Sequence, residues 1–422
     1  MATTLRHQDR PANRIRNGAG SYLSLLPLLL VGCDKTMLVG DIDDGIGGKP
    51  QDPQNPAVTD GAAGTSTTPS PTGGSGGPSL TATGGTIGGT GGTTSAVRPA
   101  DVCAPISTAA GVMNPCGHAF GVAYSPDGQL LAVGMERANP SVRIWRLVDG
   151  MPLPALGGLE ANEIAYSVAF SPDGKTLAAA GEHQDSTGSL AAWVRQWDVA
   201  SGALVRSLPA ACGQYADSLA FSHDGQRLAT GCYNGTVEIW QVADGSRLVE
   251  MASPNSVHNL HFSPDDSLLI VATVDGTARI WDPGTGTMLT DTIRVAAEMA
   301  DADFSPDGKQ IASTFQTSTA ATGNNQVWIW DATTGGMVQS LSGHDQYISK
   351  VVWIDQNRLV SDDWSGRVIL WARDASGAFS MAKTWSTGGQ AMGIGVSPDK
   401  TTIAVGGTAT DGQGDGFVFL TL

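Results

Sequence analysis

Short apolar runs alternate with turn residues along most of the chain, and the clearest copy of this pattern covers residues 260–282. There, three apolar runs are separated by Ser-Pro-Asp-Asp and by Asp-Gly. In the first turn, Pro presets φ and Asp bonds back to the backbone. An Asp-Gly pair before an alternating run is typical of a second hairpin. The pattern predicts three antiparallel strands, and a fourth strand that follows a turn at Gly284 and Gly286.

The same unit recurs in phase, with roughly 40 to 50 residues between successive first turns. These turns begin at Ser125, Ser171, Ser222, Ser263, Ser305 and Ser397, and a degenerate copy covers 354–357. The third strand of each copy ends at Trp145, Trp197, Trp240, Trp281, Trp330 and Trp371, with Leu420 in the seventh place. A fixed period of this length indicates a repeat architecture, so we expect seven copies of one four-stranded unit.

Trp-Asp pairs stand at 197–198, 281–282 and 330–331, and Gly-His pairs stand at 117–118 and 343–344. With these residues the chain resembles the WD-repeat β-propeller family over roughly residues 101–422. The resemblance implies an all-β fold, a seven-bladed propeller of four-stranded antiparallel blades. In that family a His, a Ser or Thr, an Asp and the Trp can form a buried hydrogen-bonded set. The sixth copy has His344, Ser361 and Trp371, but Ser365 stands where Asp is usual, so we expect an incomplete set there.

The seventh copy contains a third strand at 416–420 and then only two more residues. Without a fourth strand, this blade would expose unpaired backbone groups along its edge. The segment just before the first inner strand has no other role in the repeat. We therefore expect part of Cys103–Met113 to pair as the outermost strand of the last blade, so that a strand from the N-terminal side closes the ring.

The first 33 residues differ in character from the repeats. Four arginines lie between positions 6 and 16, and an apolar run covers 22–31, which is too short for a permanent membrane span. The run ends in Leu-Val-Gly-Cys at 30–33, which resembles the bacterial lipobox. That resemblance implies a signal peptide at 1–32, cleavage before Cys33, and acylation of its thiol. We expect export and lipid anchoring, on the periplasmic side or the surface of a bacterium; a plain signal peptide is the alternative.

Residues 33–100 are rich in Gly, Thr, Ser and Pro, which cannot bury enough apolar surface to offset ordering entropy. We expect a flexible tether here and one propeller domain at 101–422. That last region holds 33 acidic and 17 basic residues, a net charge of −16. Such a charge repels nucleic acid, so nucleic-acid binding is excluded as the expected function.

Five cysteines are consistent with an oxidising compartment. If Cys33 is acylated, four cysteines remain, with three possible pairings. Cys103 with Cys116, and Cys212 with Cys232, are the economical choice because each pair is close in sequence. Four buried free thiols are the alternative, and no Cys-x-x-Cys spacing predicts zinc.

Connections between second and third strands are the lengthened ones in this chain, and they emerge on the same face as the connections between blades. Long loops on a rigid scaffold commonly carry function, and exposed aromatics among polar groups are typical of recognition surfaces. Trp364 is the strongest single candidate on this face. The other candidates are Asp362, Asp363, Tyr347, Asp345, Tyr215, His183, Gln184, Asp185, Glu136, Arg137 and Asn324. We expect this face to bind a protein partner, without an enzyme's chemistry and without a cofactor.

An enzymatic or metal-binding alternative rests on the inner strands of the fourth and fifth copies. His258, His261, Asp301 and Asp303 lie there, and these residue types could form a nitrogen and oxygen cluster on the central axis. A buried His–Asp pair between blades explains the same residues. No nucleophile elbow and no His-Glu-x-x-His motif occurs in the sequence.

Overall fold

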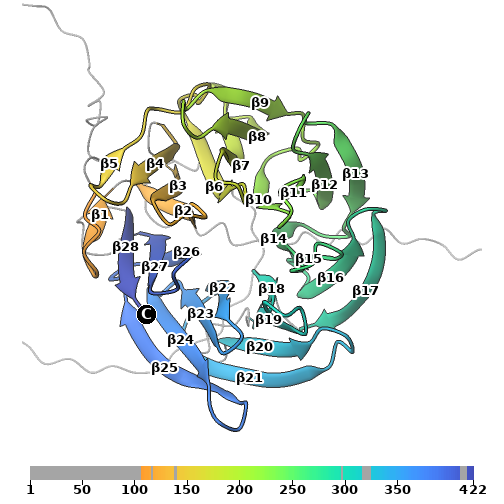
Figure 1. The fold of residues 1–422 in the computed structure, drawn as a ribbon. Helices are drawn as coiled ribbons and strands as arrows, with labels where there is room; N and C mark the ends of the chain where they lie inside the picture. The colour runs from red at the N-terminus through yellow and green to blue at the C-terminus, as the bar shows by residue number, and fades with distance from the viewer. Residues whose placement is uncertain (1–105, 116, 137–139, 296–297, 316–324, 409–415) are drawn as a thin grey trace, which may run out of the picture. The chain divides into compact units, whose positions relative to one another are not determined.

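The computed structural model describes residues 106–422, except 116, 137–139, 296–297, 316–324 and 409–415. In this part of the chain, seven four-stranded antiparallel sheets form a ring around a central axis, as Figure 1 shows. The expected all-β, seven-bladed propeller is therefore confirmed. Over the described ranges the elements are all strands, and no helix is long and apolar enough to cross a membrane. Cys33, the expected signal peptide and the expected tether lie outside the described residues.

We number the blades 1 to 7 in the order of their inner strands. The inner strands are β2 (His118–Tyr124), β6 (Glu163–Phe170), β10 (Ala216–Phe221), β14 (Val257–Phe262), β18 (Ala302–Phe304), β22 (Ile348–Asp355) and β26 (Ala391–Val396). The second strands are β3 (Leu130–Glu136), β7 (Thr176–Gln184), β11 (Arg227–Cys232), β15 (Leu269–Thr273), β19 (Gln310–Phe315), β23 (Arg358–Asp363) and β27 (Thr402–Gly407). The third strands are β4 (Val142–Arg146), β8 (Leu190–Asp198), β12 (Thr236–Gln241), β16 (Thr277–Asp282), β20 (Asn325–Asp331), β24 (Arg367–Arg373) and β28 (Gly416–Thr421). The outer strands are β5 (Met151–Pro152), β9 (Leu204–Leu208), β13 (Arg247–Ala252), β17 (Thr287–Arg294), β21 (Met337–His344), β25 (Phe379–Ser386) and, in blade 7, β1 (Met113–Pro115).

The repeated Ser-Pro-Asp turn connects the first and second strands of a blade. In blade 1 the Ser125 hydroxyl donates to Asp127 Oδ1 at 2.6 Å and accepts the N–H of Leu130 at 2.9 Å. The residue after the Asp has a positive φ, which Gly adopts without strain. Blade 4 has Asp266 in this place, with φ 59°. Its carboxylate accepts backbone N–H groups of the blade 3 turn, so the strained residue also links two blades.

Apolar side chains of neighbouring blades pack against each other and form the core. All six tryptophans that end third strands are buried. At the junction of blades 1 and 7, the Trp145 ring lies 5.4 Å from the Phe417 ring. The large buried rings therefore hold one blade against the next.

The ring closes as expected in kind, through a strand from the N-terminal side. In Figure 1, β1 lies beside β28, and Met113 pairs with Val418. The strand begins at Met113, where the expected segment ends, so the expected position was too early. The reason is a loop closed by Asn114, whose side chain accepts the Ser107 N–H at 2.6 Å and donates to the Ser107 carbonyl at 2.9 Å. Cys103 and Cys116 lie outside the described residues.

Candidate functional site

Antiparallel order places two kinds of connection on one face of the ring: those between second and third strands, and those between blades. We call this the long-loop face, and its described connections include 185–189, 211–215, 345–347 and 364–366. Asp185 holds the first of these loops, because its carboxylate accepts the N–H groups of Thr187 and Ser189 at 2.8 and 2.9 Å. Arg137 and Asn324, two of the candidates, lie outside the described residues.

The remaining candidates fall into three groups: exposed, half-buried and fully buried. Gln184, Asp185 and Asp345 are exposed, and Asp345 forms an ion pair with Arg367 at 3.0 Å. Half-buried side chains are those of His183, Tyr215, Tyr347, Trp364 and Glu136. Trp364 is therefore less exposed than expected, because its ring packs 4.5 Å from the ring of Tyr347.

Asp362 and Asp363 were expected on this surface, and that expectation is wrong because both are fully buried. Asp363 Oδ2 lies 2.8 Å from His344 Nδ1, and His344 Nε2 lies 2.6 Å from Ser361 Oγ. Ser361 Oγ also accepts the Trp371 indole N–H at 2.8 Å. Blade 6 thus has the complete buried set. The expectation that Ser365 replaces the Asp is corrected, since Ser365 instead donates to Asp363.

Cys212 and Cys232 form a disulfide, as expected. Strand register shows that it occupies the place of the His–Asp pair of blade 6. Cys232 pairs with Ala216 as Asp363 pairs with Ile348. Two residues earlier, Thr230 accepts the Trp240 indole N–H at 3.0 Å, as Ser361 accepts that of Trp371. In both blades a buried link therefore ties the connection before the inner strand to the end of the second strand.

A β-bulge interrupts six of the seven inner strands at the same repeat position. Register shifts lie, for example, between Ala119 and Gly121 in blade 1 and between Ala216 and Ser218 in blade 3. A bulge leaves one residue unpaired and redirects its side chain. The bulged residues are Phe120, Tyr166, Asp217, His258, Ser349 and Met392, and Ala300 holds the equivalent place in blade 5.

These seven residues line one hollow at the mouth of the central axis, on the long-loop face. Tyr347, Lys350 and Trp364 complete its wall, and its volume is about 140 Å³. We call this hollow the axial mouth. Sequence reasoning named Tyr347, Trp364 and, as an axis residue, His258, but it missed the other bulged residues. The signal that could have found them is their shared place, four residues before the large residue near the end of each inner strand, as Phe120 stands before Tyr124.

Aromatic rings and carboxylates concentrate on the blade 1 to 3 side of the axial mouth. Phe120 and Tyr166 lie 5.2 Å apart, and Tyr166 and Tyr215 lie 5.5 Å apart. Burial raises the pKa of the Glu182 carboxyl, although a hydrogen bond with Tyr166 opposes the rise. Asp217 lies 3.4 Å from His258 Nδ1. Across the mouth, the Lys350 charge lowers the pKa of the buried Asp301 and opposes the burial that raises the pKa of Asp362.

Below the mouth, three of the four expected axis residues come together. His261 Nε2 lies 3.1 Å from Asp301, and Nδ1 lies 3.7 Å from Asp303. Burial opposes the charge of His261, but the two carboxylates prevail and raise its pKa. Asp301 also accepts the Val351 N–H at 3.1 Å, so this cluster links blades 4, 5 and 6. His258 is not part of it, because His258 faces Asp217 in the axial mouth.

The axis residues are not among the groups whose ligand atoms converge closely enough to hold a metal in the described part of the chain. One such group is Cys212, Cys232 and Glu238, in which the sulfurs are bonded to each other. The other is Glu160, Glu163 and His183 on the long-loop face. There, Glu163 already pairs with Arg195 at 2.7 Å. The geometry at the axis therefore fits an inter-blade ion pair.

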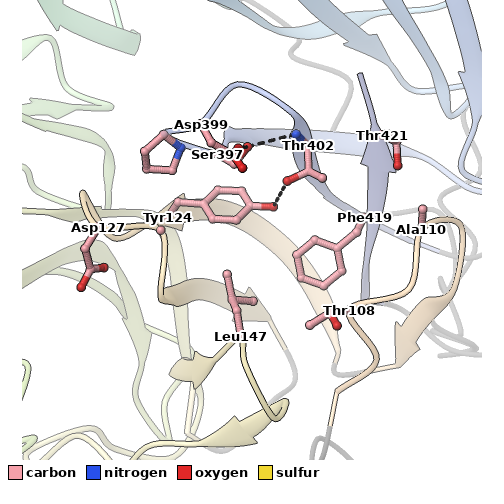
Figure 2. A pocket seen from close by; sticks show the side chains of 12 residues that line it. Thr108, Ala110, Tyr124, Asp127, Leu147, Ser397, Asp399, Thr402, Phe419 and Thr421 are labelled. Atoms are coloured by element: carbon pink, nitrogen blue, oxygen red, sulfur yellow. Dashed lines mark hydrogen bonds between the residues drawn. The ribbon is translucent and has the colours of Figure 1, made fainter.

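A larger hollow of about 370 Å³ lies on the opposite face, at the junction of blades 7 and 1. Figure 2 shows Tyr124 directed towards Thr402, with an oxygen separation of 3.4 Å, and Phe419 beside it. Burial raises the pKa of Tyr124 to about 12. Asp127 and Asp399 at its rim are each bonded to the serine of their own turn. Its polar groups thus serve the turns and the ring closure.

Three segments, residues 112–146, 202–241 and 246–282, match the family described as WD domain, G-beta repeat. Among curated proteins, none matches the chain. A solved structure described as "Crystal Structure of Mitotic Checkpoint Complex" is similar with a TM-score of 0.61 and 18% identity, over 75% of this chain and 96% of that chain. At this identity the likeness concerns the fold alone. Three segments of the chain therefore match WD40 repeats, and the described residues fold as a seven-bladed β-propeller, as the repeat pattern implied.

Proposed function

We propose that this propeller is a non-enzymatic binding or scaffolding module that recognises a protein partner on its long-loop face. The observation that carries the proposal is the axial mouth, where a bulge in six of the seven inner strands directs a side chain to one hollow. Half-buried aromatic side chains beside charged groups are typical of the residues that dominate binding energy in protein interfaces. Tyr215, Tyr347 and Trp364 meet that description.

Site-specific crosslinking in cells tests this proposal. A photoreactive residue at position 364 should trap a partner, and the same residue at position 385 should not. Trp385 is a suitable control because it is another half-buried Trp of blade 6, on the outer strand β25. In the native chain, Trp364→Ala should abolish the complex and Trp385→Ala should leave it intact. Equal capture from both positions, or full binding by Trp364→Ala, would refute the proposal.

We also infer that the module is exported and held at a membrane of a bacterium through acylated Cys33. The support is the lipobox-like sequence at 30–33 and the Gly-, Ser- and Thr-rich stretch behind it. Stable anchoring of this kind requires more than one acyl chain. The Cys33→Ser chain should move from the membrane fraction to the aqueous fraction of expressing cells. An unchanged membrane fraction would contradict the anchor.

A further inference from the structure

We infer that the axial mouth accepts a cationic side chain, an arginine or lysine of the protein partner. This inference rests on the proposed function and specifies what the partner must present. Three features of the mouth carry it: its aromatic walls, its carboxylates, and the distribution of its own positive charges.

Aromatic side chains line the mouth on two sides. Phe120 and Tyr166 contribute rings from blades 1 and 2, and Tyr347 and Trp364 contribute two rings that lie 4.5 Å apart in blade 6. The faces of such rings attract a cation, and they do so more strongly when water is displaced. The volume of about 140 Å³ suits one long side chain and not a folded element.

Carboxylates supply the charge that complements a cation. Asp217 lines the mouth directly, and Glu182 lies behind Tyr166 with only 8% of its surface exposed. Within the described residues, neither carboxylate pairs with a lysine or arginine: Asp217 faces His258, and Glu182 bonds to Tyr166. A buried carboxylate without a cation is costly, so a cationic partner group gains by entering this side of the mouth.

The one lysine that lines the mouth lies across from these carboxylates. Lys350 lies on blade 6, where its charge faces Asp301 and Asp362. His258 points its Nδ1 to Asp217, and its Nε2 has no hydrogen-bond partner among the described residues. The entering cation would thus meet Asp217 and the ring of Tyr166.

The test uses the whole chain and three short peptides, Gly-Gly-Arg-Gly-Gly, its lysine version and its norleucine version. Tryptophan fluorescence and calorimetry should show saturable binding of the two cationic peptides, weakened by salt, and none of the norleucine peptide. Asp217→Asn should weaken binding about tenfold or more, as expected for the loss of a charged hydrogen-bond partner. Asp149→Asn, which removes an exposed carboxylate paired with Arg146, is the matched control.

The outcomes separate this inference from the proposed function. If Trp364→Ala abolishes the crosslinked complex while the cationic peptides neither bind nor compete with the partner, the cation inference is wrong and the binding face stands. If neither the peptides nor Trp364→Ala has an effect, both are wrong. Because the norleucine comparison uses the native chain, it remains decisive even if a variant fails to fold.

Discussion

Replacement of Asp362 by Asn should remove a pH-dependent destabilisation of blade 6. The side chain is fully buried, and its Oδ1 accepts the Lys350 backbone N–H at 2.9 Å. Its Oδ2 has no hydrogen-bond partner among the described residues. Burial is the main cause that raises the pKa of this carboxyl from its ordinary value of 3.8 to about 7. The folded chain therefore holds a proton at pH values where the unfolded chain has lost it.

The sign and size follow from that difference in proton binding. Because the pKa of Asp362 is raised in the folded chain, the contribution of this group to stability is fully present below about pH 4. That contribution is lost as the pH rises from there through about 7. A rise from 3.8 to about 7 corresponds to roughly 4 kcal/mol in total, of which roughly 3 kcal/mol falls between pH 5 and pH 9. Asn keeps an oxygen for the Lys350 N–H and carries no charge. The free energy of unfolding of Asp362→Asn, relative to the native chain, should therefore increase by that amount from pH 5 to pH 9.

Denaturant unfolding followed by tryptophan fluorescence at pH 5, 7 and 9 measures this difference. The neighbouring Asp363→Asn is an informative control. Burial alone would raise the pKa of Asp363, but its bonds to His344 and Ser365 prevail and lower it. Asp363→Asn should therefore destabilise the fold at neutral pH. A difference between Asp362→Asn and the native chain that stays constant from pH 5 to 9 would show that Asp362 is ionised throughout, and the reasoning would be refuted.

Three further predictions concern the other buried links. Cys212→Ser with Cys232→Ser should lower the free energy of unfolding by about 3 kcal/mol, because the disulfide closes a loop with a sequence separation of 20; denaturant midpoints measure it, and an unchanged midpoint would contradict it. Trp281 Nε1 has no hydrogen-bond partner in the described structure, and position 271 matches the Ser361 position in register. Val271→Thr would supply a hydroxyl that accepts this N–H, so it should stabilise blade 4 by about 1 kcal/mol. Calorimetric titration with divalent metal should show no saturable binding at the axis; binding that His261→Ala abolishes would instead favour the enzymatic alternative.

Thr230→Val is the matched control for the Val271→Thr prediction. It removes the hydroxyl that accepts the Trp240 indole N–H in blade 3 while keeping the side-chain shape. It should therefore cost about 1 kcal/mol or more, since it leaves a buried donor unpaired. Opposite signs for these two changes would support the register equivalence; the same sign for both would contradict it.

Much of the fold follows from residues that repeat in phase. The Ser-Pro-Asp turns and the strand-ending tryptophans set the blade number and the strand order, because one of each recurs in almost every copy. The closing strand was predictable in kind, since an unpaired edge at β28 needs a partner. Its position was not, because it depends on the side-chain bonds of Asn114 to Ser107, which no repeat pattern encodes.

The axial mouth was harder to predict, and β-bulges are the physical reason. In a regular strand, Phe120 or Tyr166 would be paired like the residues beside it. The extra residue of a bulge cannot be recognised from the apolar pattern of the sequence. The same effect hid the role of Asp363. The bulge between Ile348 and Lys350 sets the register that pairs Asp363 with Ile348 and brings it to His344. The family pattern, applied to the sequence alone, placed Ser365 in that position instead.

The disulfide of blade 3 and the His344–Asp363 pair of blade 6 have the same effect on the long-loop face. Cys212 and His344 each lie three residues before an aromatic residue of the long-loop face, Tyr215 and Tyr347. Both links tie the connection that carries that aromatic ring to the end of a second strand. A connection fixed in this way loses less conformational entropy when a partner binds. Loss of the disulfide should therefore weaken partner binding at Tyr215 even under conditions where the propeller remains folded.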